Sequence, residues 1–211
     1  MMTEIFSATV IIGILTSGIR LATPYLYAAI GEAFGQRSGV LNLGVEGQML
    51  LGAFVSFYIA FTTENLWLGV LGAMLVGALM GLAMAYVTVN VQAEQGISGI
   101  GFYLFGLGMS ELLFKMLLGT VETVKGFSVF PVPWLSDIPI IGEIFFQQNI
   151  LVYIAFLLVP TAWFVLNKTT LGLKIRSVGE NPEAADSLGV SVARVRYFTI
   201  ILGGTLSGVA G

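Results

Sequence analysis

The stretch "LWLGVLGAMLVGALMGLAMAYVTVNVQA" (residues 66–93) decides the fold, because it carries no charged side chain. It is longer than the roughly 20 apolar residues that a helix needs to cross the hydrocarbon core of a bilayer. Small residues recur along it at every fourth position, at Gly69, Ala73, Gly77, Gly81 and Ala85. Residues four apart share one helix face, and a face of small residues lets helix backbones approach closely in lipid. We therefore predict a membrane-spanning helix that packs against other helices, with a pore-lining face as the alternative.

The composition of the whole chain agrees with this stretch. The 211 residues are 56% hydrophobic and only 10% charged, whereas soluble domains average about 25% charged residues. Cysteine and histidine are absent, which excludes disulfides and thiolate metal sites and removes the commonest general base. No basic patch indicates a nucleic-acid partner. We therefore predict an all-α, polytopic membrane protein that is not an enzyme and binds no metal or cofactor.

Charge-free runs on both sides of this stretch predict further spans. They lie near residues 5–30, 47–63, 97–118 and 150–167, and a sixth begins near Val192. Arg20 and Pro24 are expected to break the first of them. The last run is still apolar at Gly211, so we expect the sequence to be a fragment of a longer protein. Residues 1–211 then form one transmembrane domain of about six spans that is incomplete at its carboxy terminus.

The basic residues predict how the chain is oriented. Five of the nine lie between the fifth and sixth spans, namely Lys168, Lys174, Arg176, Arg194 and Arg196. Positive charge marks cytoplasmic loops, so this connection is predicted to be cytoplasmic, with the amino terminus and the connection at 119–149 outside. The outer connection carries prolines on both sides of Trp134. The prolines exclude a regular helix there, and the tryptophan indicates a position at the membrane interface.

A first polar cluster lies in "GQRSGVLNLGVEGQMLLGAF" (35–54), where Arg37, Asn42 and Glu46 stand among several glycines. Each glycine weakens a helix by roughly 1 kcal/mol relative to alanine. Irregular backbone at membrane depth is tolerated where protein or a water-filled cavity covers it, and polar residues there usually mark a transport path. One interpretation is therefore a broken or re-entrant helix beside a translocation path. The other is a cytoplasmic turn, with Asn42 capping the second span and Glu46 in its first turn.

A second polar cluster, "GENPEAADSLGVS" (179–191), predicts a short helix over residues 182–188. It follows the order of a capped helix, with an N-cap, a proline at the first position, two acids near the positive end of the dipole and a glycine stop: Asn181, Pro182, Glu183, Asp186 and Gly189. Ser191 can then cap the sixth span. Because so short a helix is unstable alone in water, it is either a handle for a soluble partner or a surface loop that folds back on the bundle.

Two longer stretches resemble a known family. "TTLGLKIRSVGENPEAADSLGVSVARVRYFTIILGGTLSGVAG" (169–211) resembles the coupling region of ABC-importer permeases of the branched-chain amino acid, ribose and nucleoside superfamily. "GEAFGQRSGVLNLGVEGQMLLGAF" (31–54) is similar to the simple-sugar and nucleoside branch of that superfamily, and so is the outer segment at 132–153. Such permeases continue for several more spans, so this sequence departs from the family's pattern by lacking the carboxy-terminal part.

The resemblance implies a permease subunit of an ATP-driven importer for nucleosides or simple sugars, in the plasma (inner) membrane of a bacterium or archaeon. Besides the lipid bilayer, it implies an ABC ATP-binding subunit, a second permease subunit that is homologous or identical, and an extracytoplasmic substrate-binding protein. ATP is expected on the partner subunit, because the chain has no G-x-x-x-x-G-K-[ST] loop. Residues 169–191 are then the cytoplasmic coupling loop. The residues expected to couple to the ATPase are Gly179, Glu180, Asn181, Pro182, Glu183, Ala184, Ala185, Asp186 and Gly189.

Polar and aromatic residues near the spans are candidates for the translocation path. They are Arg37, Asn42, Glu46, Gln48, Phe102 and Tyr103. Polar side chains can pair with the hydroxyls of a sugar or nucleoside, and aromatic rings can stack on a base; the alternative for the aromatic residues is contact with the core or with lipid. The competing function is an ATP-independent secondary transporter or channel, which requires paired charges inside the membrane. Glu111 with Lys115 is the one such pair, and it lies near the end of a span.

Overall fold

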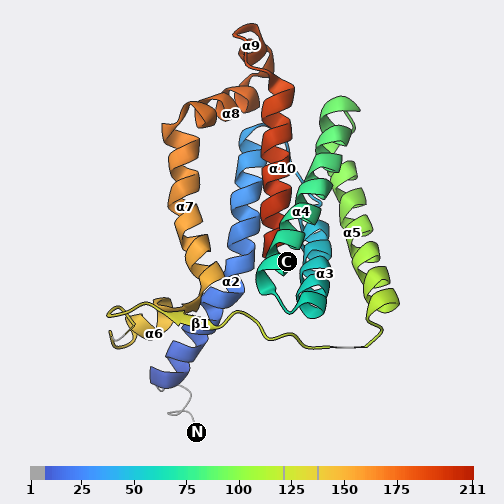
Figure 1. The fold of residues 1–211 in the computed structure, drawn as a ribbon. Helices are drawn as coiled ribbons and strands as arrows, with labels where there is room; N and C mark the ends of the chain where they lie inside the picture. The colour runs from blue at the N-terminus through green and yellow to red at the C-terminus, as the bar shows by residue number, and fades with distance from the viewer. Residues whose placement is uncertain (1–7, 121, 137) are drawn as a thin grey trace.

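The computed structural model describes residues 8–120, 122–136 and 138–211, and most of these residues are helical (Figure 1). The long helices are α2 (Ala8–Arg37), α3 (Val45–Thr63), α4 (Leu66–Ala85), α5 (Gln95–Leu117), α7 (Ile150–Lys168) and α10 (Val192–Ala210). The shorter elements are the π-helix η1 (Tyr86–Asn90), which extends α4, then β1 (Val129–Pro131), α6 (Ile141–Phe145), β2 (Gln147–Asn149), α8 (Thr170–Glu180) and α9 (Pro182–Ser187). This architecture confirms the predicted all-α, polytopic bundle.

Five helices in the described part of the chain are long and apolar enough to cross a membrane. They correspond to the first five predicted spans, so the chain is a multi-pass membrane protein. The sixth predicted span, α10, has the same 19-residue length as α3 and α7. It is not among the five, and it carries Arg194 and Arg196 in its first turns. The predicted start of the first span, at residue 5, lies outside the described residues.

Helix α2 is continuous, which corrects the break predicted at Arg20 and Pro24. Proline is tolerated inside membrane helices because neighbouring groups satisfy the freed backbone oxygens. The Arg20 side chain finds a partner at one end of the bundle, where its Nε donates to Gln148 Oε1 at 2.9 Å. Further toward the carboxy terminus of α2, the Tyr27 hydroxyl donates to the carbonyl oxygen of Leu151 at 2.7 Å. These two bonds fasten α2 to β2 and to the start of α7.

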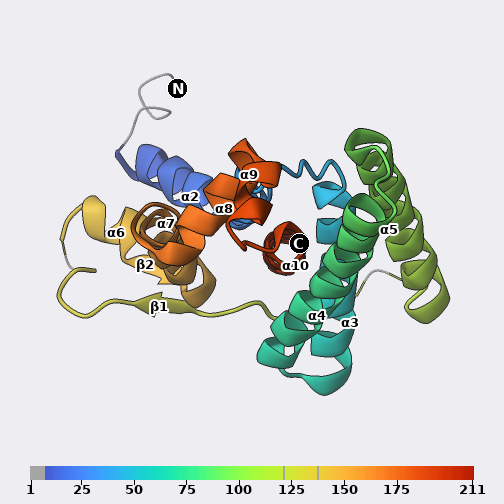
Figure 2. The same ribbon diagram turned by 90° about the horizontal axis from the view of Figure 1, so that it is seen from above.

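Helix α10 lies at the centre of the bundle, between α2 on one side and α3 and α4 on the other (Figure 2). A Cβ on Gly77 of α4 would overlap the carbonyl oxygen of Gly204 of α10, and a Cβ on Gly208 would overlap that of Ala73. Ala73 and Gly77 of the predicted stripe therefore meet the small residues of α10, backbone against backbone, whereas Gly69 meets Ser56 of α3. At these positions the stripe serves helix packing and does not line a pore.

The basic residues gather at the end of the bundle that carries α8 and α9 (Figure 1). Six of the nine belong to this end, namely Arg37, Lys168, Lys174, Arg176, Arg194 and Arg196, and the other three are Arg20, Lys115 and Lys125. Helix α2 ends at this end of the bundle, while the chain between α5 and β1 runs along the opposite end, as the predicted topology requires. That the α8–α9 end faces the cytoplasm stays a prediction from its positive charge.

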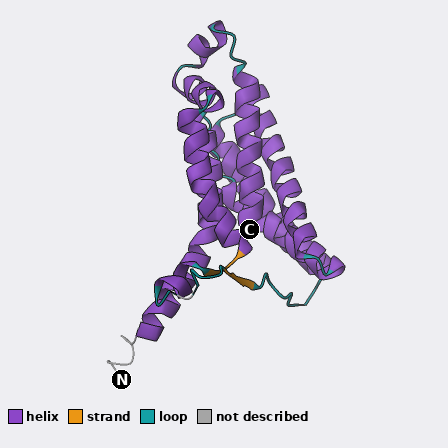
Figure 3. Ribbon diagram, turned by 60° about the vertical axis from the view of Figure 1, so that its left-hand side comes forward, coloured by secondary structure: helices purple, strands orange, loops and turns teal. Residues whose placement is uncertain are grey.

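The outer connection lies beside the start of α2, where β1 and β2 pair antiparallel (Figure 3). Val129 stands opposite Asn149, and Pro131 opposite Gln147. As the prolines predicted, no helix forms in the described residues between β1 and α6. The Trp134 side chain is 89% exposed, and its place at the membrane interface stays a prediction.

Candidate functional site

The polar cluster at 35–54 contains a true interruption between two membrane helices. Helix α2 continues to Arg37 and α3 begins at Val45, so residues 38–44 lie outside both helices. This segment descends beside α5: a Cβ on Gly39 would lie 3.4 Å from Gly179 Cα at the α8–α9 end, whereas a Cβ on Gly44 would lie 2.9 Å from Phe102 Cβ. Phe102 is about two turns into α5, so the segment reaches about 10 Å into the bundle at 1.5 Å of rise per residue.

Backbone carbonyl oxygens of α2 accept the N–H groups of residues 38–40, and side-chain oxygens accept those of Leu41, Asn42 and Gly44. The N–H of Leu41 donates to Gln95 Oε1 at 2.8 Å, and the N–H of Asn42 donates to Glu32 Oε1 at 3.0 Å. The N–H of Gly44 donates to Asn42 Oδ1 at 2.9 Å. Backbone N–H groups away from water must be paired, and irregular backbone at membrane depth persists only under such cover. Residues 38–44 therefore connect two consecutive spans, and their backbone agrees with the irregular backbone predicted there; a broken helix beside a translocation path stays a prediction.

The alternative interpretation, a simple turn capped by Asn42, is wrong in one part. Gly44 occupies the N-cap position of α3 and its backbone φ is −89°. No side chain caps α3, because the Asn42 amide oxygen bonds to the N–H of Gly44 itself. Glu46 does lie in the first turn of α3, as that interpretation expected. Glu32 and Gln95 were not predicted; the only signal for Glu32 was an acid close to the end of an apolar run.

Asn42 and Gln48 form a buried amide pair inside the bundle. Asn42 Nδ2 donates to Gln48 Oε1 at 3.3 Å. The Gln48 side chain is fully buried, yet its Nε2 has no hydrogen-bond partner within the described residues. A buried amide without a partner costs roughly 1–3 kcal/mol. The Nε2 group of Gln48 is therefore available to donate a hydrogen bond to a further group beside this pair.

The other path candidates are dispersed around this pair. Arg37 and Glu46 are exposed, and Phe102 and Tyr103 are half-buried. Tyr103 meets α3 through its backbone, since a Cβ on Gly47 would lie 2.7 Å from Tyr103 Cα. The structure thus brings Asn42 and Gln48 together and does not gather all six residues at one place.

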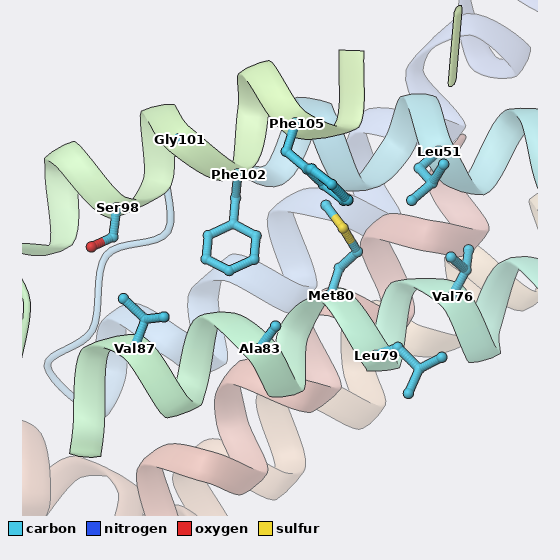
Figure 4. A pocket seen from close by; sticks show the side chains of 10 residues that line it. All are labelled: Leu51, Val76, Leu79, Met80, Ala83, Val87, Ser98, Gly101, Phe102 and Phe105. Carbon is cyan, nitrogen blue, oxygen red and sulfur yellow. The ribbon is translucent and has the colours of Figure 1, made fainter. Parts of the chain in front are cut away.

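Phe102 belongs to an apolar groove of about 550 Å³ between α4 and α5 (Figure 4). Its ring points toward α4, near Ala83, and Phe105 and Met80 continue the wall (Figure 4). Of the lining residues, only Ser98 carries a polar side chain. A sugar or nucleoside would leave most of its hydroxyls unpaired here, at a cost for each. The groove therefore fits the alternative that was predicted for the aromatic residues, which is contact with apolar groups.

The short helix predicted at 182–188 is confirmed as α9, Pro182–Ser187. Asn181 Oδ1 accepts a hydrogen bond from the N–H of Ala184 at 3.0 Å, as expected for an N-cap. Gly189 has φ +82°, and its N–H donates to the carbonyl oxygen of Asp186 at 2.8 Å. This is the glycine stop that the sequence predicted. Ser191 stands at the N-cap of α10, but its side chain makes no capping bond, so that prediction was wrong.

Helix α8 was not predicted. Residues 170–180 are helical, whereas residues 169–191 were predicted as a coupling loop with one short helix. Thr169 Oγ1 accepts a hydrogen bond from the N–H of Gly172 at 3.2 Å and caps the helix. Ile175 is fully buried and packs against Ile30 and Phe34 of α2. The signal that sequence reasoning missed was apolar residues at helical spacing after a threonine cap. The predicted coupling region is thus two helices, of which α8 packs on the bundle and α9 projects from its end.

Lys174 is exposed on α8, whereas the exposed charges from the end of α8 to Gly189 are acidic. Exposed residues there are Glu180, Asn181, Glu183, Ala184, Asp186 and Gly189, whereas Gly179 and Pro182 are half-buried. Ala185 is only 2% exposed and faces inward, and Leu188 is 84% exposed at the tip. Of the two predicted alanines, only Ala184 is therefore accessible to a partner. Leu188 was not among the predicted residues.

The charge pair considered for a secondary transporter lies on the surface of α5. Lys115 Nζ is 2.6 Å from Glu111 Oε1, and their side chains are 70% and 62% exposed. The two residues are four apart on one helix, which is the ordinary spacing of a helical surface pair. The geometry gives no support to buried, ion-coupling charges at this position.

Comparisons with known proteins agree with this geometry. Residues 14–211 match the model of a family described as branched-chain amino acid transport system / permease component. A putative glucose ABC transporter permease protein of Haloferax volcanii is 39% identical over 204 residues, which cover 94% of this chain and 61% of the relative. A guanosine ABC transporter permease protein of Bacillus subtilis is 37% identical over 202 residues, covering 90% of this chain and 63% of the relative.

A nucleoside ABC transporter permease protein of Lactococcus lactis gives a similar match, 38% identical over 199 residues, which cover 90% of this chain and 63% of the relative. The chain thus spans slightly less than two thirds of the length of these three relatives. No solved structure matches the chain.

Proposed function

Since the chain belongs to the branched-chain amino acid transport system permease family, we propose that it is the membrane-spanning permease subunit of an ATP-driven importer for nucleosides or simple sugars. In this proposal a separate ABC ATP-binding subunit hydrolyses ATP, and this chain binds none. A second permease subunit, identical or homologous, and an extracytoplasmic substrate-binding protein complete the importer. Its place is the plasma membrane of a bacterium or archaeon.

The proposal depends on the position and the caps of helix α9. It has six residues and projects beyond the ends of the neighbouring helices (Figure 1). Asn181 and Gly189 fix its two ends, although a helix of this length is not stable alone in water. Glu183 on this helix and Leu188 directly after it are exposed. A rigid, capped projection with charged and apolar groups at its tip suits the docking of a soluble subunit.

The substrate class follows from what the relatives' names share. Glucose, guanosine and other nucleosides all carry a sugar ring with several hydroxyls. We assign the contact with these hydroxyls to Asn42 and Gln48, because Gln48 Nε2 is buried and has no hydrogen-bond partner in the part of the chain that the structure describes. A site that pairs with a hydroxyl discriminates strongly against analogues that lack it. Substrates without ring hydroxyls should therefore compete poorly.

A crosslinking experiment tests the docking role. Residues 1–211 contain no cysteine, so Leu188→Cys adds one thiol to them, and this thiol is the attachment point for a photo-crosslinker in the full transporter. We expect it to capture a protein that carries a nucleotide-binding loop. Trp134→Cys is the matched control, because Trp134 is as exposed as Leu188 but lies at the opposite end of the bundle. Uptake that persists with no ATPase captured at position 188 would contradict the proposal.

A second test uses the two neighbouring alanines. Ala184→Glu adds bulk and charge at an exposed position of α9, so we expect the chain to fold but the transporter to lose substrate uptake. Ala185→Glu places a charge at a position that is 2% exposed, so we expect loss of folded protein. Normal uptake by Ala184→Glu would show that α9 does not dock the ATPase.

A further inference from the structure

The two polar clusters touch through their backbones. A Cβ on Gly179, near the end of α8, would overlap the carbonyl oxygen of Arg37 and lie 3.2 Å from the backbone nitrogen of Gly39. Gly39 has φ +81°, a conformation that favours glycine. Because both residues are glycines, the backbones of Gly179 and Gly39 approach each other directly. A displacement of Gly179 toward this segment is therefore not absorbed locally.

Helix α10 holds the same segment from the other side of α9. Ser38 is fully buried, and its Oγ lies 2.8 Å from Thr199 Oγ1. Arg196 Nε donates to the carbonyl oxygen of Ser38 at 3.3 Å. Thr199 and Arg196 lie in the first turns of α10, which follows α9 after four residues. Helix α8, which precedes α9, and helix α10, which follows it, thus both contact the first residues of the segment 38–44.

The far end of the segment reaches the buried amide pair. Asn42 is bonded to Gln48 of α3 and, through its own N–H, to Glu32 of α2. The segment has no helical hydrogen bonds to hold it at Asn42; these side chains fix it instead. A close-packed interior transmits displacement, so the segment is a direct connection between the docking surface and the bundle interior.

We propose that residues 38–44 relay the movement of α9 to Asn42 and Gln48, with Gly179 and Thr199 as the positioning residues that drive the relay. The inference rests on the proposed function, because the docked ATPase is what moves α9. Coupling of this kind requires an element whose position both sites bias, and residues 38–44 are the element that contacts both.

The test follows one reporter inside the segment of the assembled transporter. Leu43 is 47% exposed, and Leu43→Cys gives the only thiol in residues 1–211. The labelling rate of this thiol is measured without nucleotide and with a non-hydrolysable ATP analogue. We expect the rate to differ at least threefold between the two states. Adding Gly179→Ala should reduce that difference to less than half, while the ATPase subunit still co-purifies with the chain.

Two controls separate a relay from simple damage. Gly108→Ala is a matched glycine substitution in α5 with no atom within 4 Å of the new Cβ, and it should preserve the difference in labelling. Thr199→Val keeps the shape of the side chain but removes the hydroxyl that faces Ser38, and should reduce the difference; Thr199→Ser should restore it. This conservative pair covers the case in which Gly179→Ala does not fold.

The outcomes are distinct. A transporter that binds its ATPase but shows no nucleotide-dependent change at position 43 overturns the relay, as does a full change in both Gly179→Ala and Thr199→Val. Failure of the Leu43→Cys parent to bind any ATPase overturns the proposed function, and the relay with it. Loss of the change in Thr199→Val with recovery in Thr199→Ser supports the relay.

Discussion

At the α4–α10 interface and along residues 38–44, the backbone packs directly against the backbone of neighbouring elements. The two regions differ in how their backbone N–H groups are paired. In the interface, two helices satisfy their own N–H and C=O groups, so small residues such as Gly77 and Gly204 suffice for close approach. In residues 38–44, the N–H groups of the first three residues donate to carbonyl oxygens in the last turn of α2. Leu41 and Asn42 lack such bonds, so Gln95 and Glu32 supply side-chain oxygens for their N–H groups. The interface depends on the absence of side chains, and the segment depends on the presence of particular ones.

This difference indicates what each region is for. An interface of small residues spreads its stability over several turns of helix and holds α10 rigidly in the bundle. The segment depends on a few polar contacts of about 1 kcal/mol each in net terms, so a modest force can rearrange it. A permease needs both properties, because a rigid frame must carry an element that moves.

The largest effect is expected from adding a methyl group to the interface. In Gly77→Ala the new Cβ meets the carbonyl oxygen of Gly204, and backbone has no rotamer with which to yield. We expect a loss of about 3 kcal/mol of stability, measured as thermal unfolding in detergent. Gly108→Ala is the matched control, since its Cβ meets nothing and helix propensity should add up to about 1 kcal/mol. Equal behaviour of the two variants would show that α4 and α10 are not in contact.

A smaller effect is expected from removing one acceptor of the segment. Glu32→Leu leaves the buried N–H of Asn42 without its 3.0 Å partner, which costs about 2 kcal/mol. Glu32→Gln keeps an oxygen at the same place and should cost less than half as much. Substrate uptake should fall in Glu32→Leu by more than its loss of folded protein explains. Identical stability of the two variants would contradict the role given to this oxygen.

The same contrast explains how far the sequence could predict the structure. The interface was predictable, because a small residue at every fourth position of a charge-free run is a local pattern with one helical interpretation. Helix α9 was predictable for the same reason, since Asn181, Pro182 and Gly189 act within one short stretch. The predicted break at Pro24 failed, because neighbouring helices decide whether a membrane helix tolerates proline.

The polar segment could be predicted only in outline. Its glycines and polar residues indicated irregular backbone, but its acceptors come from other elements, and Gln95 is 54 positions from Leu41. The partners of Ser38 and Gly179 are also far away in the sequence. No local periodicity records such pairings. The sequence offered Asn42 as a cap of the second span, whereas its amide bonds to Gly44 and Gln48; which residues line the path stays a prediction.

A local effect is expected at the cap of α9. Asn181→Ala removes the oxygen that accepts the N–H of Ala184 and should cost about 1 kcal/mol of helix stability. Because Asn181 is exposed, the bundle should unfold at an unchanged temperature while hydrogen exchange at Ala184 accelerates and uptake falls. Asn181→Ser restores a capping oxygen and should recover both. A lowered unfolding temperature in Asn181→Ala would show that α9 contributes to the frame as well as to docking.

The smallest effect is a pH dependence that should separate the two regions. Glu94 caps α5, and hydrogen bonds from the N–H groups of Ile97 and Gly96 lower the pKa of its carboxyl from the ordinary 4.5. The bonds favour the charged form, so their stabilisation is present above pH 4.5 and is lost as the pH falls through the lowered value. Fraying of α5 at this cap loosens the neighbouring Gln95, which holds Leu41. Acidification should therefore speed amide exchange at Gly96 and Leu41, after correction for intrinsic rates.

The α4–α10 contact should not respond over the same range, because its small residues carry no ionisable group. Glu94→Asn is the decisive control: asparagine is also a good N-cap but does not titrate, so exchange at Gly96 and Leu41 should become independent of pH. If Leu41 still responds to acid in this variant, the segment senses pH through another group, and the start of α5 is not what steadies it. If Leu41 responds only with Glu94 present, the segment is held by single side chains, whereas the interface is not.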